Sequence, residues 1–344
     1  PHHLMGFDRK YFYRHNGDLS LQNFSGCGND FQSENPMARR LIIDSLEYWV
    51  REYHVDGFRF DLAELIDDET LHQIEKRLLA IKPGIILIHE PWSYRGTNKG
   101  RFKKTTWASW NDDFRNRVKA AAMGKAGAAD LWPVLKGSVD LWTDSPWESV
   151  NYVESHDDYT LTDFLTENQN HDGSTPNARE VRRNLFCAAA TLLSPGIPML
   201  AQGQEMMRSK KGNGNSYNAG DVVNAVDYTL RDRNRATYAF YADLIAFRQS
   251  AEGQILRDLD GEACRHAYLV AANNPNAAGI LWTSPRSPDK RMLVLFNPDA
   301  HQKLLFHPVL PPGTWYRLIN DGRVFSRGSV YVRQLTVSPN DSSP

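Results

Sequence analysis

Apolar residues recur with helical spacing in several stretches of the chain. One stretch begins after Pro36, and others lie at about 71–81, 179–193 and 236–249. The first of these predicted helices is expected to end at His54. One face of it should be buried, formed by Ile42, Leu46, Trp49, Val50 and Tyr53.

Short strand-like runs lie between these helices, at 55–61, 85–88, 150–153 and 197–200. The second run is continuously apolar, which is typical of a parallel strand buried on both faces. Strands that alternate with helices predict an α/β fold with a parallel sheet, either a closed barrel or an open, doubly wound sheet. Residues 1–36 show no sustained period, so they are expected to form a long surface loop.

The pattern changes in the last quarter of the chain. Strand-like runs separated by Pro, Gly and Asn clusters now follow one another, at Ala267–Ala271, Met292–Phe296, Lys303–Phe306 and Trp315–Leu318. We therefore expect two domains, an α/β domain at 1–252 and a small antiparallel β-sandwich at 253–344.

Composition narrows the range of partners. The 344 residues include 40 basic and 41 acidic side chains, so the net charge of −1 provides no broad field for nucleic acid or an anionic membrane. The three cysteines suggest neither a disulfide framework nor a metal cluster. No run of about eighteen apolar residues predicts a membrane span. The chain begins at Pro1 without an initiator Met or a signal sequence, so we expect a fragment of unknown localisation.

Acidic residues follow the predicted strands. Asp61 and Glu90 end the first two runs and Asp157 follows the third, so the three carboxylates are expected to meet at one edge of the sheet. Arg59 should lie beside Asp61 and keep it ionised, unless the two form only a structural salt bridge. Glu90, between an apolar strand and Trp92, should favour its protonated form; a helix-capping role is the alternative. Such a pair suits glycoside hydrolysis.

The run HDD at 156–158 could in principle bind a metal ion. No second cluster of His or acidic residues completes a coordination set, so we predict no metal site. Hydrogen bonds from His156 and Asp157 to sugar hydroxyls fit these residues better.

Three runs taken in order, VDGFRFD (55–61), HEPW (89–92) and VESHD (153–157), resemble the conserved regions around the catalytic acids of the α-amylase superfamily, glycoside hydrolase family 13. The resemblance implies a (β/α)8 TIM barrel followed by a C-terminal antiparallel β-sandwich. It also implies a covalent glycosyl-enzyme intermediate on Asp61, acid/base catalysis by Glu90 and transition-state stabilisation by Asp157. Residues 1–252 would then be the C-terminal part of the catalytic barrel, about strands 4–8.

Two further runs, GCGND (26–30) and GQE (203–205) followed by KGNGNSYN (211–218), are similar to type I pullulanases, with isoamylases and glycogen debranching enzymes as close relatives. This implies hydrolysis of α-1,6 branch linkages in pullulan, amylopectin, glycogen or limit dextrins, without a cofactor or a protein partner. A structural calcium ion occurs in parts of the family, but no residues for one can be identified here. The implied substrate contacts are Arg59, His156, Trp92, Asn215 and Tyr217.

The chain departs from the family pattern in three respects. The first conserved region and the first three barrel strands have no counterpart, which predicts poor stability for the isolated chain. Asp158 stands where relatives usually carry Asn or Gly, and Tyr228 stands where many carry Trp.

Other functions stay open beside debranching. The same three acids could serve an α-1,4-acting amylase or a glucanotransferase, and a relative that kept the fold could be a non-catalytic glucan-binding protein. A nucleotide-binding enzyme is disfavoured, because neither a G-x-G-x-x-G nor a G-x-x-x-x-G-K-[ST] run is present.

Overall fold

A computed structural model describes residues 2–298, 310, 313–315, 319–320, 323–324 and 335–337 of the chain. The chain divides into two compact units, each described by itself below. The first holds residues 1–110, 142–144 and 148–150, and the second holds 111–141, 145–147 and 151–344. The expected domain boundary between 252 and 253 stays a prediction.

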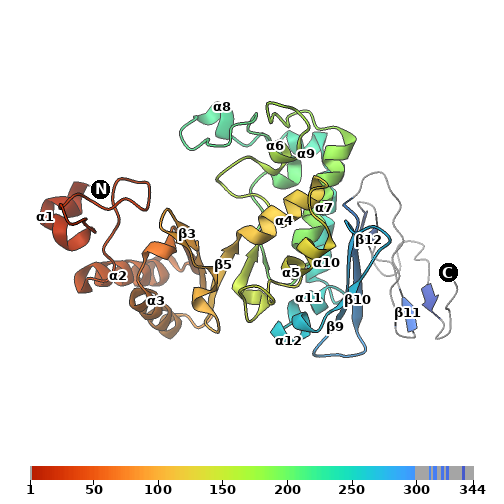
Figure 1. Ribbon diagram of the computed structural model, residues 1–344, viewed down its shortest axis with the longest axis horizontal. Coiled ribbons are helices and arrows are strands. Elements are labelled where there is room, and N and C mark those ends of the chain that lie inside the picture. Colours follow the sequence, from red (N-terminus) through yellow and green to blue (C-terminus); the bar gives the residue numbers. More distant parts are fainter. Residues whose placement is uncertain are drawn as a thin grey trace. The chain divides into compact units, whose positions relative to one another are not determined.

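The first unit combines helices with short parallel strands (Figure 1). Its helices are α1 (His2–Phe12), α2 (Pro36–Tyr53) and α3 (Asp68–Ile81), and its strands are β1 (Gly57–Phe60), β2 (Ile86–His89), β3 (Trp92–Ser93), β4 (Gly96–Thr97), most of β5 (Trp107–Asn111) and the start of β6 (Ser149–Asn151).

The strands β1, β2 and β5 pair in parallel, as the sequence predicts. Phe60 of β1 is opposite His89 of β2, and His89 is in turn opposite Ser109 of β5. Within this unit the strand order along the sheet is β1-β2-β5-β6. The strand β2 is not buried on both faces, however, because Leu87 is fully buried whereas Ile86 is 51% exposed.

Helices α2 and α3 lie side by side (Figure 1), and their buried side chains form one apolar cluster with Phe60 of β1 and Leu87 of β2. Leu71, Ile74 and Leu78 of α3 are fully buried, which confirms the predicted helical face. The helix α2 ends at the predicted residue, since its C-cap His54 has a left-handed backbone with φ of 56°. Its predicted face is partly wrong, because Ile43 is buried whereas Trp49 and Tyr53 are exposed.

The expected loop at 1–36 is interrupted by α1. This helix is kinked at Asp8, whose φ of −155° and ψ of 95° are not helical. A kink of this kind breaks the 3.6-residue spacing, which explains why the sequence shows no sustained period there. Residues 13–35 connect α1 to α2 without a further helix.

The second unit begins within β5 and is largely helical before it becomes strand-rich (Figure 1). Its helices are α4 (Asp112–Ala122), α5 (Ala128–Leu135), α6 (Leu161–Leu165), α7 (Ala178–Leu192), α8 (Asp221–Asn224), α9 (Leu230–Arg233), α10 (Arg235–Gln249), α11 (Gln254–Asp258) and α12 (Gly261–Arg265). Its strands are β7 (Ile197–Pro198), β8 (Tyr268–Val270), β9 (Ala278–Thr283), β10 (Arg291–Phe296), β11 (Gly313–Trp315), β12 (Ile319–Asn320), β13 (Arg323–Val324) and β14 (Leu335–Val337).

The core of the second unit joins helices α4, α5, α7 and α10 to the antiparallel sheet β10-β9-β8. Trp282 of β9 is buried in this core, and the indole N–H of Trp132 in α5 donates to the Gly279 carbonyl at 3.2 Å. The helices predicted at 179–193 and 236–249 are confirmed as α7 and α10. Strand β9 was not predicted, because its run AGILWT contains a glycine and follows the Asn- and Pro-containing stretch NNPN at 273–276.

The β-sandwich expected after residue 253 stays a prediction. Strands β8 and β10 confirm two of its predicted runs, and β11 contains Trp315 of a third. The run at 303–306 lies outside the described residues, as do residues 316–318. No helix among the described residues is both long and apolar enough to cross a bilayer.

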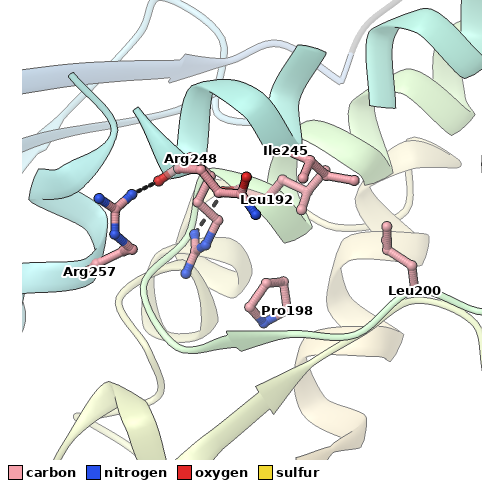
Figure 2. A pocket seen from close by; sticks show the side chains of 7 residues that line it. Leu192, Pro198, Leu200, Ile245, Arg248 and Arg257 are labelled. Atoms are coloured by element: carbon pink, nitrogen blue, oxygen red, sulfur yellow. Dashed lines mark hydrogen bonds between the residues drawn. The ribbon is translucent and has the colours of Figure 1, made fainter. Parts of the chain in front are cut away.

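A cavity of about 430 Å³ lies in the second unit, beside β7 and α10 (Figure 2). Its apolar wall includes Leu192, Pro198 and Leu200. At its edge Arg248 donates to the carbonyls of Leu192, Ser194 and Gly196. None of the predicted site residues lines this cavity.

Candidate active site

Two acidic side chains follow neighbouring strand ends in the first unit. Asp61 comes directly after β1 and Glu90 directly after β2. Because Phe60 and His89 are opposite each other, the two acids emerge at the same edge of the sheet. The amide of Glu90 donates to the Phe60 carbonyl at 3.0 Å, which continues the strand pairing up to the acids.

Arg59 connects the two acids. Its Nη1 donates to Asp61 Oδ1 at 2.5 Å, and its Nη2 lies 3.1 Å from Glu90 Oε1. The guanidinium also lies over the ring of Trp110, with its central carbon 4.2 Å from the ring centroid. A planar guanidinium suits such a bridge, because it offers two donors in a fixed fork while one face rests on an aromatic ring.

The two carboxyl groups differ sharply in exposure. The side chain of Asp61 is 70% exposed, whereas that of Glu90 is 4% exposed. Besides Arg59, the Glu90 carboxylate contacts the backbone N–H of Leu62, which donates to Oε2 at 2.6 Å. One acid therefore faces solvent, where a substrate can reach it, and the other is held by protein groups.

The contact from Leu62 depends on an uncommon backbone conformation. Leu62 has φ of 44° and ψ of 43°, in the left-handed region that non-glycine residues seldom adopt. This turn directs its N–H towards Glu90 immediately after Asp61. Backbone strain of this kind is concentrated at functional sites, where the surrounding structure maintains it.

Aromatic side chains flank the acids. The ring centroids of Trp92 and Trp110 are 6.2 Å apart, in a tilted arrangement. Tyr94, two residues after Trp92, covers Gly26, where an added Cβ would lie 2.7 Å from the ring. Asp30 holds this neighbouring turn by accepting from two backbone amides, those of Phe24 and Ser25. The GCGND run therefore packs against the loop that carries Trp92.

His89 is a buried neighbour of Glu90 along the chain. Its ring makes edge contacts with Phe102 and Trp107, at centroid distances of 5.3 and 6.3 Å. Burial, helped by the charge of Arg101, lowers the pKa of His89 to about 3. The imidazole is therefore neutral at ordinary pH and forms part of the packing beneath the acids.

Asp157 lies in the second unit, in the turn after β6. Its Oδ2 lies 3.4 Å from His156 Nε2, and both side chains are more than half exposed. Asp158 has φ of 64°, a left-handed conformation that Asn and Gly adopt at lower cost. This accounts for the Asn or Gly expected at this position. The Asp158 carboxylate is 3.7 Å from Arg115.

Asn215 and Tyr217 lie in a loop of the second unit that starts after the 3-10 turn at 204–206. Asn215 donates its backbone N–H to Asn213, and the Tyr217 side chain is exposed. Tyr228 is also exposed, and its hydroxyl accepts from Gln202 at 3.0 Å. Exposure leaves these side chains accessible to a ligand, and their expected role as substrate contacts stays a prediction.

The structure thus brings Arg59, Asp61 and Glu90 together within the first unit, and His156 and Asp157 within the second. The predicted meeting of all three acids stays a prediction, as does the protonated state of Glu90. Sequence reasoning missed the Leu62 amide, which no side-chain pattern could reveal. Strand β5 was not predicted from the sequence either, so the contact of its buried residue Trp110 with Arg59 was also missed.

The described ranges contain no candidate metal site. No group of three or more His, Cys, Asp or Glu side chains there could hold a metal ion. The described acids of the site are instead engaged by Arg59, His156 and backbone amides.

Comparison with known proteins shows what the chain resembles. Residues 10–252 match the family model described as the alpha-amylase catalytic domain. A pullulanase of Bacillus subtilis is 33% identical over 364 aligned positions, covering 96% of this chain and 48% of that protein. A chloroplastic isoamylase 3 of Oryza sativa subsp. japonica is 31% identical, covering 71% of this chain and 37% of that protein. The chain therefore spans about half the length of these relatives, or less.

Solved structures give the same result. The pullulanase from Bacillus acidopullulyticus is similar with a TM-score of 0.84 and 30% identity, covering 95% of this chain and 42% of that one. A pullulanase from Paenibacillus barengoltzii, in complex with maltohexaose and alpha-cyclodextrin, has a TM-score of 0.81 and 28% identity. The match covers 92% of this chain and 52% of that one. The fold is accordingly of the (β/α)8-barrel type, with the parallel strands described above. The chain belongs to the alpha-amylase catalytic-domain family.

Proposed function

We propose that this chain carries the catalytic acids of a retaining glycoside hydrolase that cleaves α-1,6 branch linkages in α-glucans. Asp61 is the nucleophile in this proposal, Glu90 is the general acid and base, and Asp157 is the third essential carboxylate. The observation that carries the proposal is the bridge by Arg59, which holds one exposed and one buried carboxyl group at adjacent strand ends.

The geometry favours a retaining mechanism. Retaining enzymes place their two carboxyl groups about 5–5.5 Å apart, whereas inverting enzymes leave room for a water molecule between them. A single guanidinium that contacts Asp61 at 2.5 Å and Glu90 at 3.1 Å favours the shorter separation. Asp61 then attacks the anomeric carbon while Glu90 protonates the departing glycosidic oxygen. In the second step Glu90 takes a proton from water, which displaces Asp61 from the sugar.

Asp157 and His156 supply hydrogen bonds to sugar hydroxyls. Contacts of this kind accelerate the reaction only if they strengthen as the oxocarbenium-like transition state forms. Both side chains are largely exposed and therefore accessible to a sugar ring. Trp92, which is half-buried beside Trp110, offers an apolar surface for a sugar face.

The relatives favour a branched or α-1,6-linked glucan as substrate. Two of the proteins similar to this chain are named pullulanase and isoamylase, and one pullulanase structure contains maltohexaose. The runs around Gly26 and Asn215 are shared with such enzymes by resemblance. Debranching is therefore preferred over α-1,4 hydrolysis or glucan transfer.

The test uses the full-length protein with pullulan, in which maltotriose units are joined by α-1,6 bonds. We expect maltotriose as the product, and no activity from the Asp61→Asn variant, which keeps the size of the side chain but removes its charge. Panose or short α-1,4 products would replace debranching with another amylase-type specificity. A folded wild type without activity on any α-glucan would instead support a glucan-binding protein.

A further inference from the structure

Lys210 is a buried lysine in the second unit that none of the proposed catalytic steps uses. Its residue is only 6% exposed, although lysine is almost never buried without a polar partner. Its ammonium Nζ donates to the backbone carbonyl of His156 at 3.1 Å. A charge-assisted hydrogen bond therefore holds the backbone next to Asp157.

The backbone of Lys210 is fixed as well. Its amide donates to Asp163 Oδ2 at 2.7 Å, and the neighbouring Ser209 hydroxyl donates to Asp163 Oδ1 at 2.5 Å. Asp163 is fully buried in helix α6 and also accepts from the Gly173 amide at 2.9 Å. The stem of Lys210 thus starts from a rigid anchor, so its ammonium has little freedom to move away from His156.

A buried carboxyl group lies in the same region. Glu154 is 4% exposed and accepts from the Leu161 amide at 2.7 Å, which closes the other end of the turn that holds Asp157. Burial, together with the charge of Arg208, lowers the pKa of Lys210, while the charges of Glu154, Asp157 and Asp163 act in the opposite sense. The turn is therefore supported from both ends by buried polar groups.

The loop that follows Lys210 packs against residues 159–171, which come directly after the turn of His156 and Asp157. An added Cβ at Gly212, whose φ is +77°, would lie 2.3 Å from the Asn170 carbonyl. A Cβ at Gly214 would lie 3.1 Å from the ring of Tyr159. Both glycines allow close packing of the loop on residues 159–171, and the next residues in this loop are the predicted substrate contacts Asn215 and Tyr217.

We propose that Lys210 is a positioning residue that fixes the turn of His156 and Asp157 and couples it to the loop of Asn215 and Tyr217. This inference rests on the proposed function, in which both segments contact the glucan. A sugar that orders the loop would thereby also order Asp157. Lys210 itself touches neither the reacting bond nor the leaving oxygen, so its effect is on the placement of Asp157.

Kinetics on pullulan test the effect on catalysis. The Lys210→Met variant keeps an unbranched stem and loses the ammonium; the exposed Lys125→Met variant of the same unit is the matched control. We expect kcat to fall on the order of 10- to 100-fold in Lys210→Met, with KM within about threefold of wild type, because Asp157 acts in the transition state. Lys210→Arg should restore part of kcat. An unchanged kcat, or an equal loss in Lys125→Met, would overturn the inference.

Hydrogen exchange provides a measurement that does not depend on activity. We expect the amides of 156–160 to exchange faster in Lys210→Met than in wild type and Lys125→Met, while the amides of helix α7 keep their protection. Unchanged exchange at 156–160 would overturn the positioning role even in an active enzyme. Faster exchange in a protein that cleaves no α-glucan would instead leave the coupling of the two segments standing and remove the proposed function.

Discussion

Arg59 contacts both acids of the first unit with different nitrogens of one side chain. A lysine ammonium carries the same charge but lacks the planar fork, and it would not rest on Trp110 in the same way. The bridge therefore depends on the shape of the guanidinium as well as on its charge. Without the guanidinium, Asp61 and Glu90 lose a side chain that contacts both of them.

At this position we predict that Arg59→Lys lowers kcat/KM on pullulan on the order of 10- to 100-fold. The loss of one hydrogen bond to a charged group costs about 1.5–3 kcal/mol, and each 1.4 kcal/mol corresponds to about tenfold in rate. Steady-state kinetics would measure the change beside Arg77→Lys, an exposed arginine of the same unit. Full activity in Arg59→Lys would show that charge alone is sufficient.

Leu62 shows a limit of residue-level reasoning. Its contribution to Glu90 is a backbone N–H, and the sequence around it reads as an ordinary strand end. The left-handed φ that directs this N–H is fixed by the tertiary structure, since leucine has no preference for it. A contact made by the main chain therefore could not be predicted from side-chain chemistry.

Helix α7 shows how one element depends on its first residue. Asn177 accepts from the amides of Arg179 and Glu180, and the Glu180 carboxylate accepts from the Asn177 amide at 2.8 Å. This reciprocal pair is a capping box, which satisfies amides that would otherwise lack partners. The same helix buries Cys187 and Ala188 in the core of the second unit, so the cap supports a central element.

We predict that Asn177→Ala lowers the free energy of unfolding by about 1 kcal/mol, within the range of about 0.5–2 known for helix caps. Urea denaturation would measure the change. Asn177→Asp should remain close to wild type, because aspartate accepts the same hydrogen bonds and its charge suits a helix N-terminus. If the alanine variant equals the aspartate variant in stability, the cap contributes nothing to folding.

The elements with strong periodicity were predictable, and those without it were not. The spacing of Leu71, Ile74 and Leu78 predicted helix α3, and the apolar run before Glu90 predicted β2. The kink at Asp8 concealed α1, because two short helical pieces give no continuous pattern. The exposure of Trp49 was also not predictable, since burial depends on which elements cover a helix and periodicity gives only its faces.

The candidate site could be predicted to a similar extent. Each acid follows a strand, and the rule that chemistry gathers at the carboxyl ends of parallel strands placed Asp61 beside Glu90 correctly. Lys210 was not predictable, because its partner is a carbonyl 54 residues earlier in the chain. Long-range contacts to the main chain leave no local pattern in the sequence.

At the scale of the whole molecule, a buried carboxyl group makes stability depend on pH. Burial raises the pKa of Glu154 to about 7, although the Leu161 amide, Arg208 and Lys210 act in the opposite sense. A raised pKa means that the folded protein binds a proton more tightly than the unfolded chain does. The stabilisation that this proton contributes is complete below the unfolded pKa of 4.5 and is lost as the pH rises through the folded pKa of about 7.

We therefore predict that Glu154→Gln, which keeps the shape of the protonated acid, gains stability relative to wild type as the pH rises from 4.5 to 7. The shift corresponds to a difference on the order of 3 kcal/mol at most, because one pKa unit is about 1.4 kcal/mol. Denaturation at a series of pH values would measure it, with the exposed Glu252→Gln as control. Parallel pH profiles for Glu154→Gln and wild type would contradict the prediction.

The proposed function is hydrolysis of α-glucan with retention, with Asp61 as the nucleophile. The most direct measurement is the anomeric configuration of the first maltotriose released from pullulan by the full-length protein, followed by proton NMR before mutarotation. Two successive displacements at the anomeric carbon predict the α-anomer at early times. Initial release of the β-anomer would mean a single displacement by water and would contradict the role of Asp61.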